Sequence, residues 1–199
     1  MLEQLLTQQL WLALLAWALS YASDFALTMH TARLYHGGAR QHFSFGGSFE
    51  LTPYYQADVD RLRRWSPRFW LALGLSMVLV ALAWVLSVVV LGQPAFFTFL
   101  VGALLLRQAA VHLRHLRNLV LFRAVRDTAA VSGQITYARP LVLKLSAAEF
   151  AAFGGLFLLL ALVTSSWFLL GGAVACCVTA YQHIRLARTA QRKATVSGA

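Results

Sequence analysis

Long apolar stretches, separated by short polar segments, most restrict what this sequence can fold into. Four of them approach or exceed the ~20 apolar residues that cross a ~30 Å hydrocarbon core, and a fifth is amphipathic at one end. Only 12% of the residues are charged, whereas soluble domains carry about 25%. Inside lipid each spanning segment must satisfy its own backbone hydrogen bonds, which selects helices. The sequence therefore predicts an all-α integral membrane protein.

Glycine, proline and hydroxyl residues mark the ends of five transmembrane helices within one membrane-embedded bundle, residues 1–199. The predicted spans cover residues 5–32, 68–91, 95–122, 141–163 and 167–186. Gly92-Gln93-Pro94 forms a tight turn between the second and third spans. A four-span alternative would join the last two spans into one broken or re-entrant unit, but their combined length favours five.

A loop over residues 36–66 separates the first two spans. Thr52-Pro53 is typical of a helix start, with an N-cap followed by proline at the first helical position. We expect a short amphipathic surface helix over residues 54–65, whose arginines face anionic headgroups.

Positive charge is distributed unevenly along the chain. The net charge is +10, and the 17 Lys and Arg gather in the loop 36–66 and its flanks, after the third apolar run, and in the tail 187–199 and the turn before it. This is the positive-inside pattern, which predicts the N-terminus outside, and the loop and tail in the cytoplasm. The expected location is the cytoplasmic (inner) cell membrane, and the expected partners are the bilayer and its anionic headgroups rather than nucleic acid.

Three ionisable residues on three predicted helices lie at membrane depth, where a charge is costly and marks a functional or structural site. By helical rise, Asp24 lies roughly 21 Å past Leu10, and Arg107 about 20 Å past the Pro94 turn. Glu149 lies about 14 Å from the opposite face. The sequence predicts a polar site centred on Asp24, Arg107 and Glu149. The alternatives are an ionic contact that merely holds the helices together, and unrelated snorkelling side chains.

Further polar residues accompany these three. Thr28 lies one turn below Asp24, and Gln108, His112 and His115 have spacings of four and three, which place them on one helical face. Tyr181, Gln182 and His183 in the last span are candidates to complete the ring.

A metal site would have to use Asp24, Glu50, His112 and His115, but His-x-x-His is a weak signal and HExxH is absent. We therefore predict no metal, and the sequence does not identify a cofactor. No local spacing places a histidine beside a serine nucleophile.

Small residues recur every fourth position in the fourth span, at Ala147, Ala151 and Gly155. Such stripes allow helix backbones to approach closely. The stripe fits either a contact between two copies of the chain or packing within the bundle.

Asp24-x-x-x-Thr28 late in the first span, followed by Glu50-x-x-Pro53, resembles an uncharacterised family of small bacterial membrane proteins with D-x-x-x-T and E-x-N-P motifs. Thr52 stands where that pattern has asparagine. The resemblance implies that Asp24, Thr28 and Glu50 act as a set, and it implies no activity.

Three functions fit these observations. The leading hypothesis is a small transport or ligand-binding protein with an inward-facing polar site. The alternatives are a membrane-embedded enzyme acting on a lipid or prenyl headgroup, and a non-catalytic scaffold or accessory subunit.

Overall fold

The structure, a computed structural model, describes residues 2–46, 52, 54–128 and 132–197. It is 84% helical, and five of its helices are long and apolar enough to cross a membrane. These helices are α2 (Leu10–His36), α4 (Pro67–Trp84, continued by the π-helical turn Val85–Val90), α5 (Pro94–Thr128), α6 (Arg139–Thr164) and α7 (Trp167–Ser197). The predicted all-α membrane fold with five spanning helices is confirmed.

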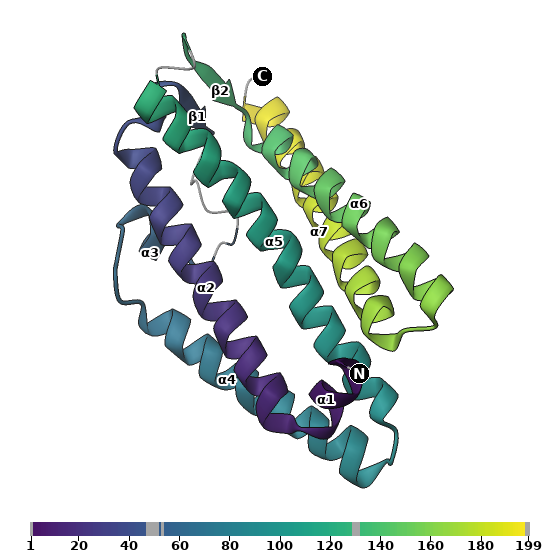
Figure 1. Ribbon diagram of the computed structural model, residues 1–199. Coiled ribbons are helices and arrows are strands. Elements are labelled where there is room, and N and C mark those ends of the chain that lie inside the picture. The colour runs from purple at the N-terminus through teal and green to yellow at the C-terminus, as the bar shows by residue number, and fades with distance from the viewer. Residues whose placement is uncertain (1, 47–51, 53, 129–131, 198–199) are drawn as a thin grey trace.

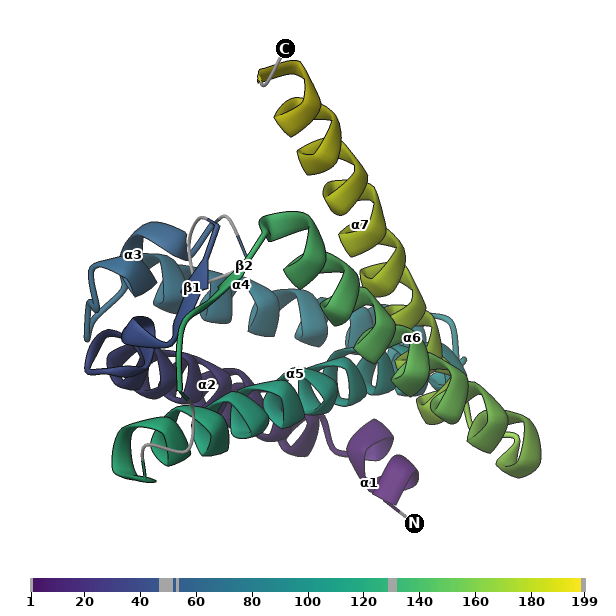
Figure 2. The ribbon, with the colours of Figure 1, turned by 90° about the horizontal axis from the view of Figure 1, so that it is seen from above.

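Helix α5 is the central element of the bundle (Figure 1). It packs against α2 on one side and against α7 on the other, while α4 extends the α2 side and α6 pairs with α7. Helices α5 and α6 make few direct contacts. In Figure 2 the C-terminal half of α7 projects away from the other helices. The bundle therefore consists of two halves joined along α5.

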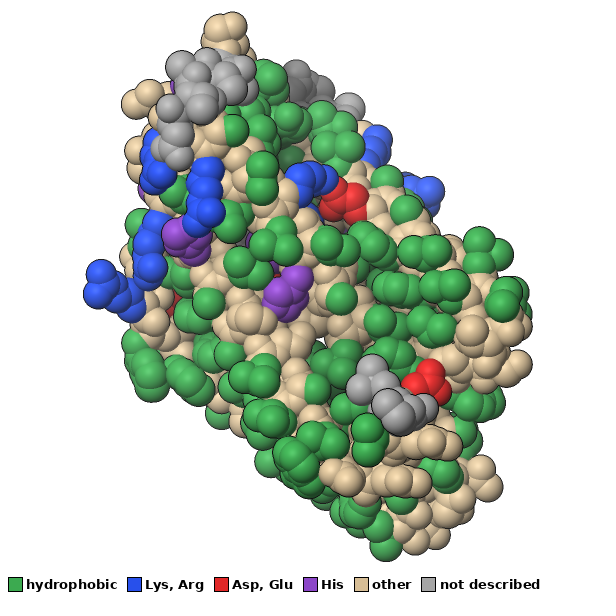
Figure 3. Space-filling model, in the orientation of Figure 1, with side chains coloured by type: hydrophobic (Ala, Val, Ile, Leu, Met, Phe, Trp, Pro, Cys, Tyr) green, Lys and Arg blue, Asp and Glu red, His purple; other side chains and the backbone are tan. Residues whose placement is uncertain are grey.

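Two short strands, which we did not predict, lie at one end of the bundle. Strand β1 (Phe43–Phe45) follows the 3-10 turn Ala39–Gln41 and pairs in parallel with β2 (Ile135–Tyr137). Their aromatic side chains pack with Tyr35 of α2 and Phe122 of α5. The strands thereby tie the chain after α2 to the chain after α5. Cationic side chains gather toward this end in the view of Figure 3.

The first span and the tail differ from their predicted bounds. The chain breaks at Gln9, so that α1 (Leu2–Gln8) is separate and α2 runs on to His36. Thr7 in α1 contacts Thr98 of α5, with 2.6 Å between the hydroxyl oxygens. At the other end of the chain, α7 continues through most of the predicted tail.

The predicted surface helix over residues 54–65 is shorter than expected. Helix α3 covers only Gln56–Asp60, and both Asp58 and Val59 are buried, whereas Arg61, Arg63 and Arg64 are exposed. Ser66 Oγ donates to Asp58 Oδ2 at 2.6 Å, and the same oxygen caps α4 by accepting from the Phe69 N–H. A buried carboxylate with these partners ties the segment to the start of α4.

Glycines allow α5 and α7 to pack at backbone distance. A Cβ on Gly102 would overlap the carbonyl of Phe168, and one on Gly171 would overlap the carbonyl of Phe99. The small-residue stripe of α6 is divided: Ala147 is buried in the bundle, whereas Ala151 and Gly155 are exposed. The close contact of α6 is made by Gly154, next to Cys177 of α7.

We expect Gly102→Ala to destabilise the protein by about 1–3 kcal/mol, because the added methyl group has no space between two backbones. Gly74→Ala is the matched control, since Gly74 lies within helix α4 with nothing within 4 Å of a Cβ. Thermal unfolding in detergent measures both variants. Equal midpoints would contradict close backbone packing of α5 on α7.

Candidate functional site

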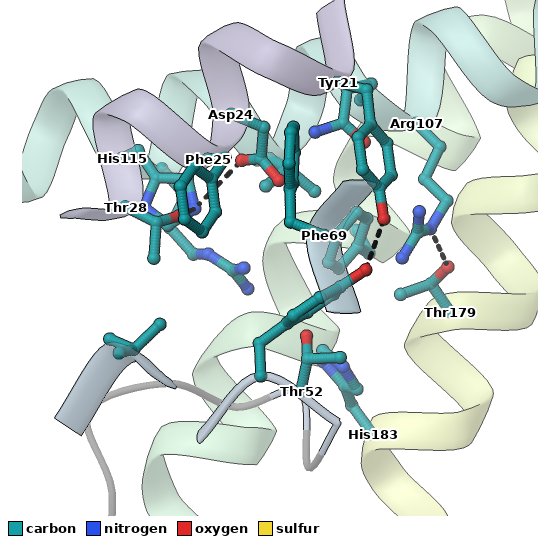
Figure 4. A pocket seen from close by; sticks show the side chains of 16 residues that line it. Tyr21, Asp24, Phe25, Thr28, Thr52, Phe69, Arg107, His115, Thr179 and His183 are labelled. Atoms are coloured by element: carbon teal, nitrogen blue, oxygen red, sulfur yellow. Dashed lines mark hydrogen bonds and ion pairs between the residues drawn. The ribbon is translucent and has the colours of Figure 1, made fainter. Parts of the chain in front are cut away.

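A polar cavity of about 240 Å³ lies between α2, α5 and α7, and the segment around Thr52, Tyr55 and Val59 also lines it. Figure 4 shows side chains from these elements converging on it. Helical spacing explains the convergence. On α5, for example, residues 107, 108, 111, 114 and 115 line the cavity, and this spacing follows one helical face. The periodicity of each helix thus supplies one wall of the site.

His115 holds α5 against α2. Its Nε2 atom lies 3.2 Å from Asp24 Oδ1 and 3.2 Å from Thr28 Oγ1. His115 is 6% exposed, and the Asp24 side chain keeps 27% of its surface accessible. The imidazole therefore bridges two α2 side chains one turn apart, as Figure 4 shows. The two residues of the D-x-x-x-T pattern contact the same ring.

Arg107 projects from α5, and its Nε donates to Thr179 Oγ1 of α7 at 3.1 Å. This is its one hydrogen bond with the residues that the structure describes, and Arg107 takes part in none of their ion pairs. The alternative of an ionic contact among Asp24, Arg107 and Glu149 is therefore not observed among the described residues, and Asp24 has His115 as its partner. Both residues nevertheless line the same cavity.

A second polar contact joins α5, α6 and α7. Arg114 Nη1 donates to Ser146 Oγ at 2.6 Å, and His183 Nδ1 lies 3.0 Å from the same oxygen. The Arg114 guanidinium also lies over the ring of Phe150, 5.7 Å from its centroid. Ser146 is buried. Its hydroxyl thus bridges two basic side chains from different helices.

Tyr55 is part of the segment that lines the cavity, and its hydroxyl is hydrogen-bonded to that of Tyr21 on α2. Burial, followed by this hydrogen bond, raises the pKa of Tyr55 above its ordinary value. The hydroxyl therefore stays protonated at neutral pH and remains able to donate. Tyr55 links the segment between α2 and α4 directly to the site.

Three buried polar atoms in the cavity wall have no hydrogen-bond partner among the described residues. One is Oδ1 of Asp24, whose contact with His115 is an ion pair. The other two are Nε2 of Gln108, a residue that is 3% exposed, and Nδ1 of His115. Buried polar groups are nearly always satisfied in folded proteins, by protein, water or a ligand. The wall thus presents two groups that are able to bind a polar molecule.

The other predicted site residues lie elsewhere. His112 turns aside to Ser23, with 2.7 Å between Nε2 and Oγ, and does not line the cavity. Glu149 forms an ion pair with Arg117. Glu50 lies outside the described residues. Within the part of the chain that the structure describes, no group of three His, Cys, Asp or Glu side chains is arranged to hold a metal ion.

Glu149 and Arg117 line a neighbouring groove of about 430 Å³ between α5 and α6, which we call the α5–α6 groove. Arg114 and His115 line both this groove and the polar cavity. The aromatic residues Phe43, Phe45 and Tyr137 of β1 and β2 also line the groove. The predicted single site is therefore two adjacent spaces with a shared wall.

Several residues of the site were not among the predicted ones. They are Tyr21, Tyr55, Arg114, Ser146 and Thr179. Arg114 had a detectable signal, since it lies two helical turns after Arg107 and adjoins His115. Of the candidate ring in the last span, His183 lines the cavity, whereas Tyr181 is exposed.

No protein-family model, curated protein or solved structure matches this chain. The resemblance carried by Asp24, Thr28, Glu50 and Pro53 therefore stays a hypothesis, and the function has to be argued from the geometry of the site.

We expect His115→Ala to destabilise the protein by about 1–3 kcal/mol, because it leaves Asp24 and Thr28 without their partner on α5. His112→Ala is the matched control on the same helix. His112 also contacts α2, but its contact with Ser23 is exposed, so we expect a loss of about 0.5 kcal/mol or less. Thermal unfolding midpoints in detergent compare the two. Equal losses would contradict the role of the buried contact in holding α2 to α5.

Proposed function

We propose that this chain is a small membrane transport or ligand-binding protein, whose polar cavity binds the anionic group of its ligand. Arg107 carries the proposal. A guanidinium at membrane depth is costly unless an anion or a wet cavity accompanies it. Among the described residues, Arg107 has only the neutral hydroxyl of Thr179 as its hydrogen-bond partner. A carboxylate or phosphate in the cavity would supply the missing charge.

The composition of the wall supports an anionic ligand. Among the described lining residues, the two guanidinium groups of Arg107 and Arg114 stand against the single carboxylate of Asp24, and His115 and His183 add ring nitrogens. That carboxylate is already in contact with His115. The unpartnered Nε2 of Gln108 adds a neutral donor. Arginine presents several N–H donors in a planar fork that matches carboxylate and phosphate oxygens.

Glu149 has a different role in this proposal from the one the sequence suggested. Its partner is Arg117, and it lines the α5–α6 groove rather than the polar cavity. We therefore centre the binding site on Arg107, with the Asp24–His115 pair beside it. The pair fixes α2 relative to α5, and so it holds the cavity open at a defined width.

The transport or binding hypothesis has more support than the two alternatives. If His115 were the general base of an enzyme, its free Nδ1 would need a nucleophile within hydrogen-bond reach. No described side chain is hydrogen-bonded to that atom. Ser146 does lie near His183, but it also accepts a hydrogen bond from Arg114 and is buried. A scaffold would leave the interior closed, whereas the described residues enclose a cavity.

Inorganic phosphate tests the proposed site. We expect phosphate, at constant ionic strength against chloride, to raise the thermal unfolding midpoint of the purified protein. Arg107→Gln should weaken the apparent affinity for phosphate at least tenfold, because the guanidinium and its charge are lost. Arg107→Lys, which keeps the charge, should have an affinity between those of the wild type and Arg107→Gln. Arg123→Gln is the control, since Arg123 lies on the same helix outside both the cavity and the groove.

An unchanged response to phosphate in Arg107→Gln would contradict the proposal. Proteoliposomes loaded with labelled phosphate distinguish a transport protein from a ligand-binding protein. Release that depends on Arg107 indicates transport, and binding without release indicates a ligand-binding protein.

We propose the orientation that the charge distribution predicts, with the N-terminus outside and the end that carries β1 and β2 in the cytoplasm of a bacterial-type inner membrane. The clustering of cationic side chains toward that end supports it (Figure 3). The cavity, which involves Arg114 and His115 in the second half of α5, would then open inward.

A cysteine at Gln93, in the turn before α5, tests this orientation in a variant whose Cys176 and Cys177 are replaced by alanine. We expect a membrane-impermeant maleimide to label it on intact cells. Labelling only after lysis would reverse the orientation.

A further inference from the structure

We infer that the ligand is an anionic lipid, with its headgroup in the polar cavity between Arg107 and the shared wall of Arg114 and His115, and its apolar chain in the α5–α6 groove. This inference rests on the proposed function, and it adds the chemical class of the ligand. The observation behind it is that the polar cavity and the groove share Arg114 and His115 as a common wall. A molecule spanning both spaces has to be polar at one end and apolar at the other.

The groove has a polar wall, which includes Arg117, Asn118, Ser146 and Glu149 besides Arg114 and His115, and a larger apolar part. Arg114 and His115 stand where it meets the polar cavity. Away from them its walls are mainly apolar and aromatic: Leu121 and Phe122 from α5, Val142, Leu145 and Ala148 from α6, and Phe43, Phe45 and Tyr137 from the strands. This is the charge distribution that an acidic headgroup and its hydrocarbon chain would complement.

The volumes of the cavity and the groove also favour placing the headgroup in the first and the apolar chain in the second. Pockets for drug-sized ligands measure about 300–1,000 Å³, and the groove, at about 430 Å³, lies in that range. The polar cavity, at about 240 Å³, is smaller and suits a headgroup or a small ion. A free anion would use only the cavity and would leave the larger, mostly apolar space without a role.

The groove is accessible from the sides of the bundle. It lies between two spanning helices that make few direct contacts with each other. Leu121 is 38% exposed, and Leu145 is 49% exposed, on its two sides. An apolar chain therefore reaches the groove from outside the bundle.

The ion pair between Arg117 and Glu149 joins α5 to α6 along this groove. It links the two helices, and it neutralises the one acid among the described residues that line the groove. The headgroup consequently meets no unpaired carboxylate there. This gives Glu149 a function distinct from the anion-binding site.

Substitution in the groove distinguishes a lipid from a free anion. Ala148→Trp places an indole among the groove residues, and Val142→Trp does so from a second position on α6. Ala152→Trp is the matched control, because Ala152 is exposed one turn further along the same helix and lines neither space. The probes are dioleoyl phosphatidylglycerol, dioleoyl phosphatidylcholine and inorganic phosphate, each added to protein in neutral detergent.

We expect native mass spectrometry to detect phosphatidylglycerol bound to the wild type and to Ala152→Trp, in preference to phosphatidylcholine. Ala148→Trp and Val142→Trp should weaken phosphatidylglycerol binding at least tenfold. Both variants should retain the thermal response to phosphate, which also shows that they are folded.

Undiminished phosphatidylglycerol binding in both groove variants would overturn the inference, and so would equal binding of the two lipids. In either case a preserved phosphate response leaves the proposed function standing with a free anion as ligand. A wild type that responds neither to phosphate nor to phosphatidylglycerol would defeat the proposed function itself.

Discussion

The constraint on which the rest of this structure depends is that a polar side chain at membrane depth must have a partner. Unpaired charges in hydrocarbon cost several kcal/mol, and the interior arrangement follows from avoiding that cost. His115 contacts Asp24 and Thr28, and Arg114 contacts Ser146. Each of these contacts joins different helices. The polar network therefore fixes which helices are neighbours, while glycine-mediated backbone packing sets how closely α5 and α7 approach.

The position of α5 explains why the site forms where it does. Its neighbours α2 and α7 lie on opposite sides, and α6 contacts it only sparsely. The helix consequently presents one face to the polar cavity and an adjoining face to the α5–α6 groove, with Arg114 and His115 at the boundary. The loose packing of α6 on α5 and the close packing of α7 on α5 thus belong to the same helix arrangement. The two spaces fit this arrangement, because α6 packs mainly on α7 and meets α5 through few contacts.

Arg107 links this architecture to the proposed function. The carboxylate that lines the same cavity, that of Asp24, is already in contact with His115. Among the described residues, the hydrogen-bond partner of the Arg107 guanidinium is a neutral hydroxyl, within the cavity that Asp24 also lines. Such an arrangement favours a ligand that brings negative charge. The apolar groove on the other side of Arg114 then favours a ligand that also carries a hydrocarbon chain.

The sequence by itself determined that the chain is a membrane protein, that it is helical and that it has five spans. Hydrocarbon admits only segments that satisfy their own backbone hydrogen bonds, and the length and hydropathy of a segment are local properties. It also indicated Asp24, Thr28, Gln108 and His115, since polar residues in apolar helices stand out. Only the tertiary structure decided their partners. Helical periodicity shows which residues share a face, but not which face meets which helix. For that reason Asp24 pairs with His115 instead of Arg107, Glu149 lies in a separate groove, and Asp58 is buried.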